Sequence, residues 1–468
     1  MTPARKHPAT VADIPALKLC TSCGVCQGIC PSRAITMKIV PGGTWAPLID
    51  ESLCTDCGLC RQSCAGSGFD FPGMQHKLFG GAPEHPEIGN TLEMFSGHCA
   101  DSDLHWKAQS GGIVSTLLLH LLETKAISGA LLVRWNPSKP MEAEPFIART
   151  REDVIQATGS KYCPVPTGKL MATVLQEEGR FAVVGPSCLI QSLRKAEVAI
   201  PALSAKIHIR IGLACLNVFA LPFHEYLRHR LKLKPDEIRS FEHRSKAWRG
   251  WPGTLRIRTH TGNDLDLPAQ ESRVIPRPFF SPWRCNLCID KANEFADITC
   301  GDCRVARHYG INNLSHLGHA HPGLSDIIVR TEAGRKTLHN AIDAGLIHAE
   351  PSSSEEITDS VRPATKKLGF EPFSAQARRN GLGVPAYGIR YLPSTPEAQA
   401  LRQSLKHRTG KASSFYIWTS SLMRHPWYPR FLARLPPALL RAINRYVHQN
   451  SWHEQLGKCQ LETITETP

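Results

Sequence analysis

Apolar and polar residues follow two different periods after the first hundred positions of this 468-residue chain. Short apolar runs over 130–135, 181–184 and 207–214 are typical of buried strands. Apolar residues at helical spacing over 113–122 and 167–178 predict helices between these strands. Because strands and helices alternate at these lengths, we expect an α/β domain with a largely parallel sheet.

The pattern changes in the second half of the chain. Residues 255–259 and 264–268 flank a glycine-containing turn and predict a hairpin added to the α/β domain. Residues 350–415 are polar and rich in proline, which predicts weak order. Residues 432–447 predict a basic amphipathic helix that is interrupted at Pro436-Pro437. The predicted regions are a loose leader (1–18), a cysteine-rich module (19–66), a linker (67–97), an α/β domain (98–270), a second cysteine-bearing region (271–349), and a polar segment with a basic C-terminal extension (350–468).

Eight of the 17 cysteines lie in the module 19–66, where the spacing C-x2-C-x2-C-x3-C occurs twice. This spacing binds 4Fe-4S clusters in bacterial ferredoxins, and the fourth cysteine of each half commonly ligates the cluster of the other half. The predicted ligands are Cys20, Cys23, Cys26 and Cys64 for one cluster, and Cys54, Cys57, Cys60 and Cys30 for the other. The two halves differ after the fourth cysteine, because Ala65 stands where the first half has Pro31.

Two zinc knuckles or a disulfide framework are the alternatives for these cysteines. Zinc sites are usually built from paired C-x-x-C units, and three close cysteines plus one fit that pattern poorly. The chain shows no secretory apolar stretch and no apolar run of membrane-spanning length. We therefore expect a cytoplasmic, reducing location, in which thiols serve as metal or redox ligands.

The net charge of +14 favours anionic partners. The basic residues are interleaved with Asp and Glu, however, and form no dense block before the C-terminal quarter, so we do not expect nucleic-acid binding. An acidic redox partner, a phosphorylated cofactor or an anionic membrane surface would use the same charge.

Three glycine-containing loops are candidates for a nucleotide site. In open α/β sheets, ligands bind beyond the carboxyl ends of the strands, and helix N-termini there present N–H groups to phosphate. The candidate residues are Ser110, Gly111, Gly112, Gly159, Ser160, Lys161, Tyr162, Gly185 and Pro186. Taken alone, each loop is also compatible with a plain turn.

Over about residues 19–345, the order of these motifs resembles the coenzyme F-420 hydrogenase/dehydrogenase beta-subunit family. The resemblance rests on the ferredoxin-like module, the three loops, Cys188, Cys215, Cys285-x-x-Cys288 and the segment 296–302. It implies a ferredoxin-like module followed by an α/β flavin-binding domain, with FAD or FMN bordered by Gly111, Gly112, Ser160, Lys161 and Tyr162. It also implies that Cys188, Cys215, Cys285 and Cys288 hold a third 4Fe-4S cluster.

A further pair, Cys300 and Cys303, opens a second interpretation of this region. Cys285, Cys288, Cys300 and Cys303 form C-x2-C-x11-C-x2-C, which is a plausible structural zinc site. That assignment would leave Cys188 and Cys215 without a role, so the cluster is favoured. The remaining thiols, Cys99, Cys163 and Cys459, are interpreted as buried or incidental.

The sequence thus predicts an iron–sulfur flavoprotein oxidoreductase. It would pass electrons between a ferredoxin or redox partner subunit and a flavin, which would act on an organic substrate or a deazaflavin-like cofactor. A non-catalytic electron-relay subunit is one alternative, and a zinc- and cluster-bearing nucleic-acid protein is another. For residues 416–468 we expect a helix packed on its own domain, with a peripheral membrane or partner contact as the alternative.

Overall fold

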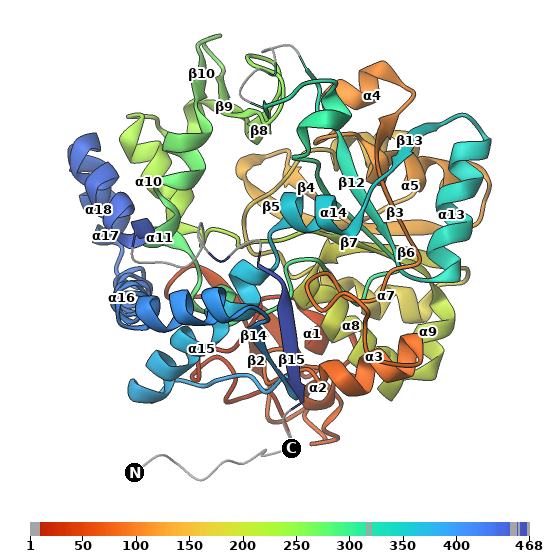
Figure 1. The fold of residues 1–468 in the computed structure, drawn as a ribbon, viewed down its shortest axis with the longest axis horizontal. Helices are drawn as coiled ribbons and strands as arrows, with labels where there is room; N and C mark the ends of the chain where they lie inside the picture. The colour runs from red at the N-terminus through yellow and green to blue at the C-terminus, as the bar shows by residue number, and fades with distance from the viewer. Residues whose placement is uncertain (1–9, 315–316, 318–320, 450–455, 457–458, 466–468) are drawn as a thin grey trace.

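One eight-stranded sheet organises the computed structural model, which describes residues 10–314, 317, 321–449, 456 and 459–465 (Figure 1). The strand order is β13-β3-β12-β11-β7-β6-β4-β5. The strands are β3 (Glu93–Cys99), β4 (Gly129–Asn136), β5 (Lys139–Ala148), β6 (Phe181–Pro186), β7 (Ile207–Leu213), β11 (Ile298–Asp302), β12 (Ser325–Val329) and β13 (Ile347–Pro351). Four consecutive strands, β11, β7, β6 and β4, are parallel, and the other neighbouring strands pair antiparallel. The α/β class is confirmed, with a mixed sheet whose centre is parallel.

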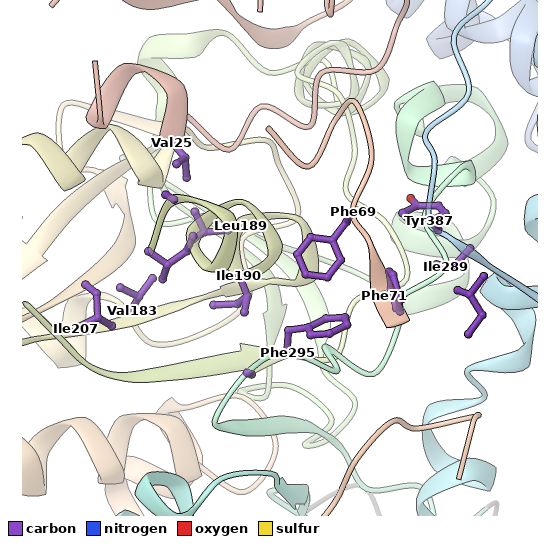
Figure 2. Close-up of a cluster of buried hydrophobic side chains, with 14 of the residues drawn as sticks. Val25, Phe69, Phe71, Val183, Leu189, Ile190, Ile207, Ile289, Phe295 and Tyr387 are labelled. Carbon is purple, nitrogen blue, oxygen red and sulfur yellow. The ribbon is translucent and has the colours of Figure 1, made fainter. Parts of the chain in front are cut away.

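Helices cover both faces of this sheet, which explains the continuous apolar runs of its central strands. On one face, Val183 of β6 packs with Leu189 and Ile190 of α8 (Ser187–Ala199) in a large apolar cluster (Figure 2). Phe181 of β6 belongs to the same cluster. On the other face, Ala182 packs in a second cluster with α5 (Ile113–Glu123) and α13 (Glu332–Asp343). Successive β6 residues therefore enter opposite cores, as the two-residue period of a strand requires.

The main sheet takes strands from both sides of residue 270. Strands β11 and β12 belong to the region predicted as 271–349, whereas their neighbour β7 belongs to 98–270. The predicted boundary at residue 270 lies between β10 (Asp264–Leu267) and β11, in a connection, so both regions contribute to one core.

The predicted hairpin over 255–268 is confirmed as β9 (Thr254–Thr259) paired with β10. With β8 (Ile238–Ser245) it forms a separate three-stranded sheet, in the order β10-β9-β8. Helix α10 (Pro222–Arg230) packs with this sheet through a shared apolar cluster that includes Phe223 and Phe241.

The N-terminal module has the near-repeat that its cysteine spacing predicts. Helices α1 (Val25–Gly28) and α2 (Leu59–Gln62) occupy equivalent places in the two halves, and β1 (Ile35–Val40) pairs with β2 (Thr44–Ile49) between them. The module docks on the α/β domain closely, because a Cβ on Gly28 would lie 2.1 Å from the carbonyl oxygen of Gly168. We predicted a loose leader over 1–18, of which residues 1–9 lie outside the described ranges. In the described part, Val11 and Ile14 are buried against the module, so this part is packed and not loose.

The expectation of weak order over 350–415 is wrong. This region contains α14 (Ser354–Val361), α15 (Ala364–Arg379), β14 (Ile389–Pro393) and the start of α16 (Pro396–Leu422). Side chains of Ser353 and Thr395 cap α14 and α16, and Pro363 and Pro396 stand at the starts of α15 and α16, where proline is tolerated. Pro372 lies inside α15. Part of the polar, proline-rich composition therefore reflects helix starts.

The predicted helix interrupted at Pro436-Pro437 is confirmed as α17 (Trp427–Arg434) and α18 (Pro437–Gln449). The other helices are α3 (Phe71–Phe79), α4 (Ser102–Lys107), α6 (Arg151–Gln156), α7 (Met171–Gln176), α9 (Pro201–Lys206), α11 (Arg277–Phe280) and α12 (Trp283–Asn286), and β15 (Leu461–Thr465) pairs with β14. Nowhere in the described ranges is a helix both long enough and apolar enough to cross a bilayer.

Candidate redox site

The first N-terminal cysteine set brings Cys64 to the first half of the repeat, as the crossed ligand pattern predicts. Burial raises the pKa of the Cys20 thiol to about 12, and the nearby Cys64 and Cys23 thiols act in the same direction. The pKa of Cys26 is raised in the same way, with Cys23, Cys64 and Cys20 among the causes. Thiols buried this close together are hard to ionise, so a positively charged iron cluster between them fits the set.

The second set, Cys30, Cys54, Cys57 and Cys60, lines one small cavity together with Thr10, Ile35 and Ile49. The pKa of Cys60 is raised by burial, with Cys30 and Cys57 among the further causes. Cys57 is the exposed member of the set. This set is thus the more open of the two in the module.

Ala65 differs from Pro31 for a physical reason. The Ala65 N–H donates a 3.1 Å hydrogen bond to Oγ of Ser192 on α8, whose hydroxyl also lies 3.5 Å from the Cys23 sulfur. A proline at residue 65 would have no N–H to donate. The break in the repeat therefore belongs to the docking of the module on α8, with α1 and α2 both packed against that helix.

A third set forms from Cys188, Cys215, Cys285 and Cys288, which come from the start of α8, the loop after β7, and α12 with the residues after it. The pKa of the Cys188 thiol is raised by burial, and the neighbouring thiols that contribute are Cys23, Cys215, Cys288 and Cys285, in decreasing order. Lys366 and Arg284 lower the pKa of the Cys288 thiol, against the effect of burial. The four thiols are therefore close enough to influence one another's pKa, with two cations beside them.

Cys300 and Cys303 do not join this third set. Cys300 lies in β11, where it pairs with Leu213 of β7 and packs in an apolar core. Burial raises the pKa of both thiols to about 12, and Asp326 is the charged neighbour that they share. Among the residues that the structure describes, no three His, Cys, Asp or Glu side chains are close enough to hold a single metal ion, and this includes the three cysteine sets. What separates Cys300 and Cys303 from the third set is their shared neighbour Asp326.

The three cysteine sets follow one another in space. Cys60 of the second set is among the neighbours that raise the pKa of Cys26 in the first set. Cys23 of the first set has the largest effect of any thiol on Cys188 of the third set. The order is therefore second set, first set, third set, from the exposed Cys57 inward.

Two of the candidate flavin loops meet at Asp302, at the end of β11. The Ser110 hydroxyl donates to Asp302, and Arg244 of β8 forms a 2.9 Å ion pair with the same carboxylate. Arg244 also donates to the Tyr162 hydroxyl at 3.3 Å. Arg244 holds the pKa of Asp302 well below its usual range, against the effect of burial. The Nη2 atom of Arg244 is buried without a protein partner, so one donor remains for a bound anion.

Further cations surround this meeting point. Burial, followed by Arg244, lowers the pKa of Arg273 to about 10. Burial also lowers the pKa of Lys291 to about 7, with Arg304 the next cause, followed by Lys366 and Arg277. Lys366 in turn lowers the pKa of the Cys215 and Cys288 thiols of the third set. A cationic zone thus extends from Tyr162 to the third cysteine set. Sequence inspection missed it, because its members are far apart in the chain and share no motif.

The remaining candidates are placed as follows. The Lys161 ammonium donates to the carbonyl oxygens of residues 157, 158 and 159, at 2.6, 2.7 and 3.1 Å, and burial lowers its pKa to about 7. Lys161 thus caps the C-terminal end of α6. Gly111 packs against the Gly97 carbonyl, Gly112 (φ +75°) begins α5, and Gly159 (φ +79°) has open space around it.

The third loop lies next to the third cysteine set. The Gly185 carbonyl accepts a 2.9 Å hydrogen bond from Asn293, and Pro186 precedes α8 and Cys188. The Ser187 hydroxyl donates to the backbone carbonyl of Asp290. The carboxylate of Asp290 raises the pKa of the Cys215 and Cys288 thiols. Gly185 and Pro186 therefore lie next to the third cysteine set, whereas the Ser110 and Tyr162 loops meet at Asp302.

Comparison with known proteins agrees with this arrangement of an iron–sulfur module and an α/β domain. Residues 19–66 match the 4Fe-4S dicluster domain. Residues 94–172 match the N-terminal part, and residues 178–355 the C-terminal part, of the family described as the beta subunit of coenzyme F420 hydrogenase/dehydrogenase. The last two matches cover more than half of the chain. The protein belongs to the coenzyme F420 hydrogenase/dehydrogenase beta-subunit family.

Individual relatives are distant. The coenzyme F420 hydrogenase subunit beta of Methanosarcina barkeri is 24% identical over 273 residues, which are 57% of this chain and 84% of that protein. A subunit of the F(420)H(2) dehydrogenase of Methanosarcina mazei is 23% identical over 372 residues, which are 78% of this chain and 94% of that protein. A chain of the F420-reducing [NiFe] hydrogenase complex from Methanosarcina barkeri has the same fold, with a TM-score of 0.50, 21% identity, and coverage of 64% of this chain and 98% of that chain.

Proposed function

We propose that this protein is an iron–sulfur flavoprotein oxidoreductase. It exchanges electrons with a ferredoxin or redox partner subunit at its N-terminal module, in a reducing cytoplasmic compartment, and acts on an organic substrate or a deazaflavin-like cofactor at its α/β domain. The observation that carries the proposal is the continuity of the three cysteine sets, which lead from exposed Cys57 to the cationic zone beside Tyr162.

Each part of the chain has a distinct task in this proposal. The twelve cysteines of the three sets would ligate three 4Fe-4S clusters, and Arg244, Arg273, Arg277, Lys291 and Arg304 would offset the charge of the phosphates of FAD or FMN. When bound, the clusters supply one-electron transfer, and a flavin supplies the exchange between one-electron and two-electron transfer. The thiols of the first and third sets are intermediate in exposure, whereas Cys57 of the second set is exposed, so the path between the module and the α/β domain is more shielded from water than its outer end.

The family relatives support a partner subunit on the donor side, because the two proteins compared above are themselves named as subunits. The net charge of +14 favours an acidic partner. A purely relaying role would give a protein that is reduced by its partner but reduces no acceptor by itself.

The test is anaerobic purification followed by counts of iron, sulfide, zinc and flavin per chain. We expect about twelve iron atoms and one flavin. Reduction of a flavin or deazaflavin acceptor by the isolated protein, with a chemically reduced ferredoxin as donor, would support an enzyme. About eight iron atoms, one zinc and no flavin would overturn the proposal.

A further inference from the structure

The last two helices lie outside the regions that match the family, which end at residue 355. They form one edge of the molecule, in blue in Figure 1. Their inner faces are firmly packed: Tyr428 and Leu432 of α17 are buried with α10, and Tyr428 donates to the Phe279 carbonyl at 3.3 Å. Asn444 of α18 donates to the Val274 carbonyl at 2.9 Å. The inner faces of both helices are therefore packed on the neighbouring elements.

The outer faces carry large apolar side chains. Trp427 and Phe431, one turn apart on α17, are 50% and 51% exposed, and their rings lie 5.9 Å apart. Leu439 and Tyr446 of α18 are 45% and 50% exposed. Large apolar side chains that are exposed together on neighbouring elements often mark a surface that binds a partner or a membrane. We call the surface formed by these four side chains and by the exposed arginines of the same segment (Arg424, Arg430, Arg434, Arg441 and Arg445) the C-terminal helical face.

Arginines flank these apolar groups, and no acidic residue lies among them in the sequence. The exposed arginines are Arg424, Arg430, Arg434, Arg441 and Arg445. From residue 398 to residue 453 the chain contains no Asp or Glu. Two arginines have neighbours from other elements: Arg441 lies 3.6 Å from Glu271, and Arg430 donates to His229 at 3.3 Å. The face is therefore cationic with little compensation.

We propose that the C-terminal helical face binds the surface of a bilayer that contains anionic lipids. Aromatic rings favour the headgroup level of a membrane, and arginines beside them pair with lipid phosphates. The two helices lie at an outer edge of the molecule, where a flat lipid surface can reach them (Figure 1). An interface with another protein would more often mix both charges at its rim. With no spanning helix in the described ranges, the contact is peripheral.

The experiment is cosedimentation of the anaerobically purified full chain with vesicles. We expect the protein to sediment with vesicles of equal phosphatidylcholine and phosphatidylglycerol and to stay in solution with pure phosphatidylcholine. The paired variant Trp427→Ser/Phe431→Ser removes the apolar anchors, and Arg434→Gln/Arg445→Gln removes two charges. Each should lower the partition coefficient at least about tenfold. Iron content and the circular dichroism of each variant show that it has folded.

Matched controls lie elsewhere on the surface. Trp248→Ser removes an aromatic that is 45% exposed, and Lys125→Gln/Lys336→Gln removes two exposed charges near the main sheet. These variants should bind as the unmodified protein does. Equal loss in the controls would mean that general charge drives binding, and it would overturn the proposal. So would absence of binding to anionic vesicles, including the case in which an acidic partner protein binds the face instead. Neither result depends on whether flavin is bound.

Discussion

The backbone N–H of Tyr162 donates a 3.0 Å hydrogen bond to Nδ1 of His243, a fully buried side chain on β8. Because Nδ1 accepts, the ring proton of neutral His243 is on Nε2, which lies 3.3 Å from Nε2 of His224. His224 is itself hydrogen-bonded to the backbone of Met141. The candidate flavin loop is thus held by a row of two buried histidines inside an aromatic cluster with Trp135 and Phe241.

Replacement of His243 should loosen this loop. His243→Ala leaves the Tyr162 N–H without its acceptor and opens a cavity, so we expect a loss of about 3 kcal/mol in the free energy of unfolding. Flavin per chain should fall as well. His243→Gln, whose side-chain carbonyl can accept the same hydrogen bond, should recover part of both. Urea unfolding and flavin counts check this, and full flavin retention in His243→Ala would contradict a positioning role.

The buried histidines should make the fold sensitive to acid. Burial lowers the pKa of His224 from 6.5 to about 4. Above pH 6.5 the residue is neutral in both the folded and the unfolded states, so it adds no pH dependence. Between pH 6.5 and 4 the unfolded chain binds a proton that the folded chain does not, so the free energy of unfolding falls as the pH falls.

For this single group the loss at pH 5.5 is about 1 kcal/mol relative to pH 7.5. Urea unfolding at the two pH values measures it. His224→Gln should reduce the difference between them, whereas His76→Gln, a change at an exposed histidine, should leave it as it is. Identical pH dependence in all three proteins would show that His224 does not titrate in this way.

Substitution of Cys188 should lower the iron content of the protein, whereas substitution of Cys300 should not. Cys188→Ser removes a thiol that faces Cys23, Cys215, Cys285 and Cys288, so we expect the loss of about four of about twelve iron atoms. Cys300→Ser changes a core thiol beside Asp326 and should keep all of them. Metal analysis of the two variants decides. Loss of zinc or iron from Cys300→Ser alone would restore the four-cysteine site over 285–303.

Arg244 should serve both stability and anion binding. Arg244→Gln removes the closer of the two ion-pair partners of Asp302, and Arg304 at 3.5 Å remains, so we expect a loss of about 2 kcal/mol in the free energy of unfolding, with at least tenfold weaker flavin retention. The double variant Arg244→Gln/Asp302→Asn removes both charges and should recover stability but not flavin. Arg256→Gln breaks the comparable pair with Asp266 in the same small sheet, away from Tyr162, and serves as the control.

If flavin returns together with stability in the double variant, Arg244 has a structural role only. Equal loss of flavin in Arg256→Gln would mean that the small sheet, and not the charge of Arg244, limits binding.

Local spacing was enough to predict the features in which neighbours in the chain act together. The repeat of Cys20–Cys30 and Cys54–Cys64 predicts the two N-terminal sets, because ligands a few residues apart must share one turn of backbone. The hairpin of β9 and β10 and the break at Pro436-Pro437 followed from turn and proline chemistry in the same way. Composition failed over 350–415, because prolines and polar residues there begin and cap helices.

The connection between the cysteine sets and the cationic zone comes from packing between distant segments. Cys23 lies beside Cys188 because α8, which follows β6 in the sheet, is the surface on which the module docks. Arg244 and Asp302 meet because β8 of the small sheet lies near the end of β11 in the main sheet. No periodicity within either segment records these distances, since they depend on the order of strands and on which helix covers which face.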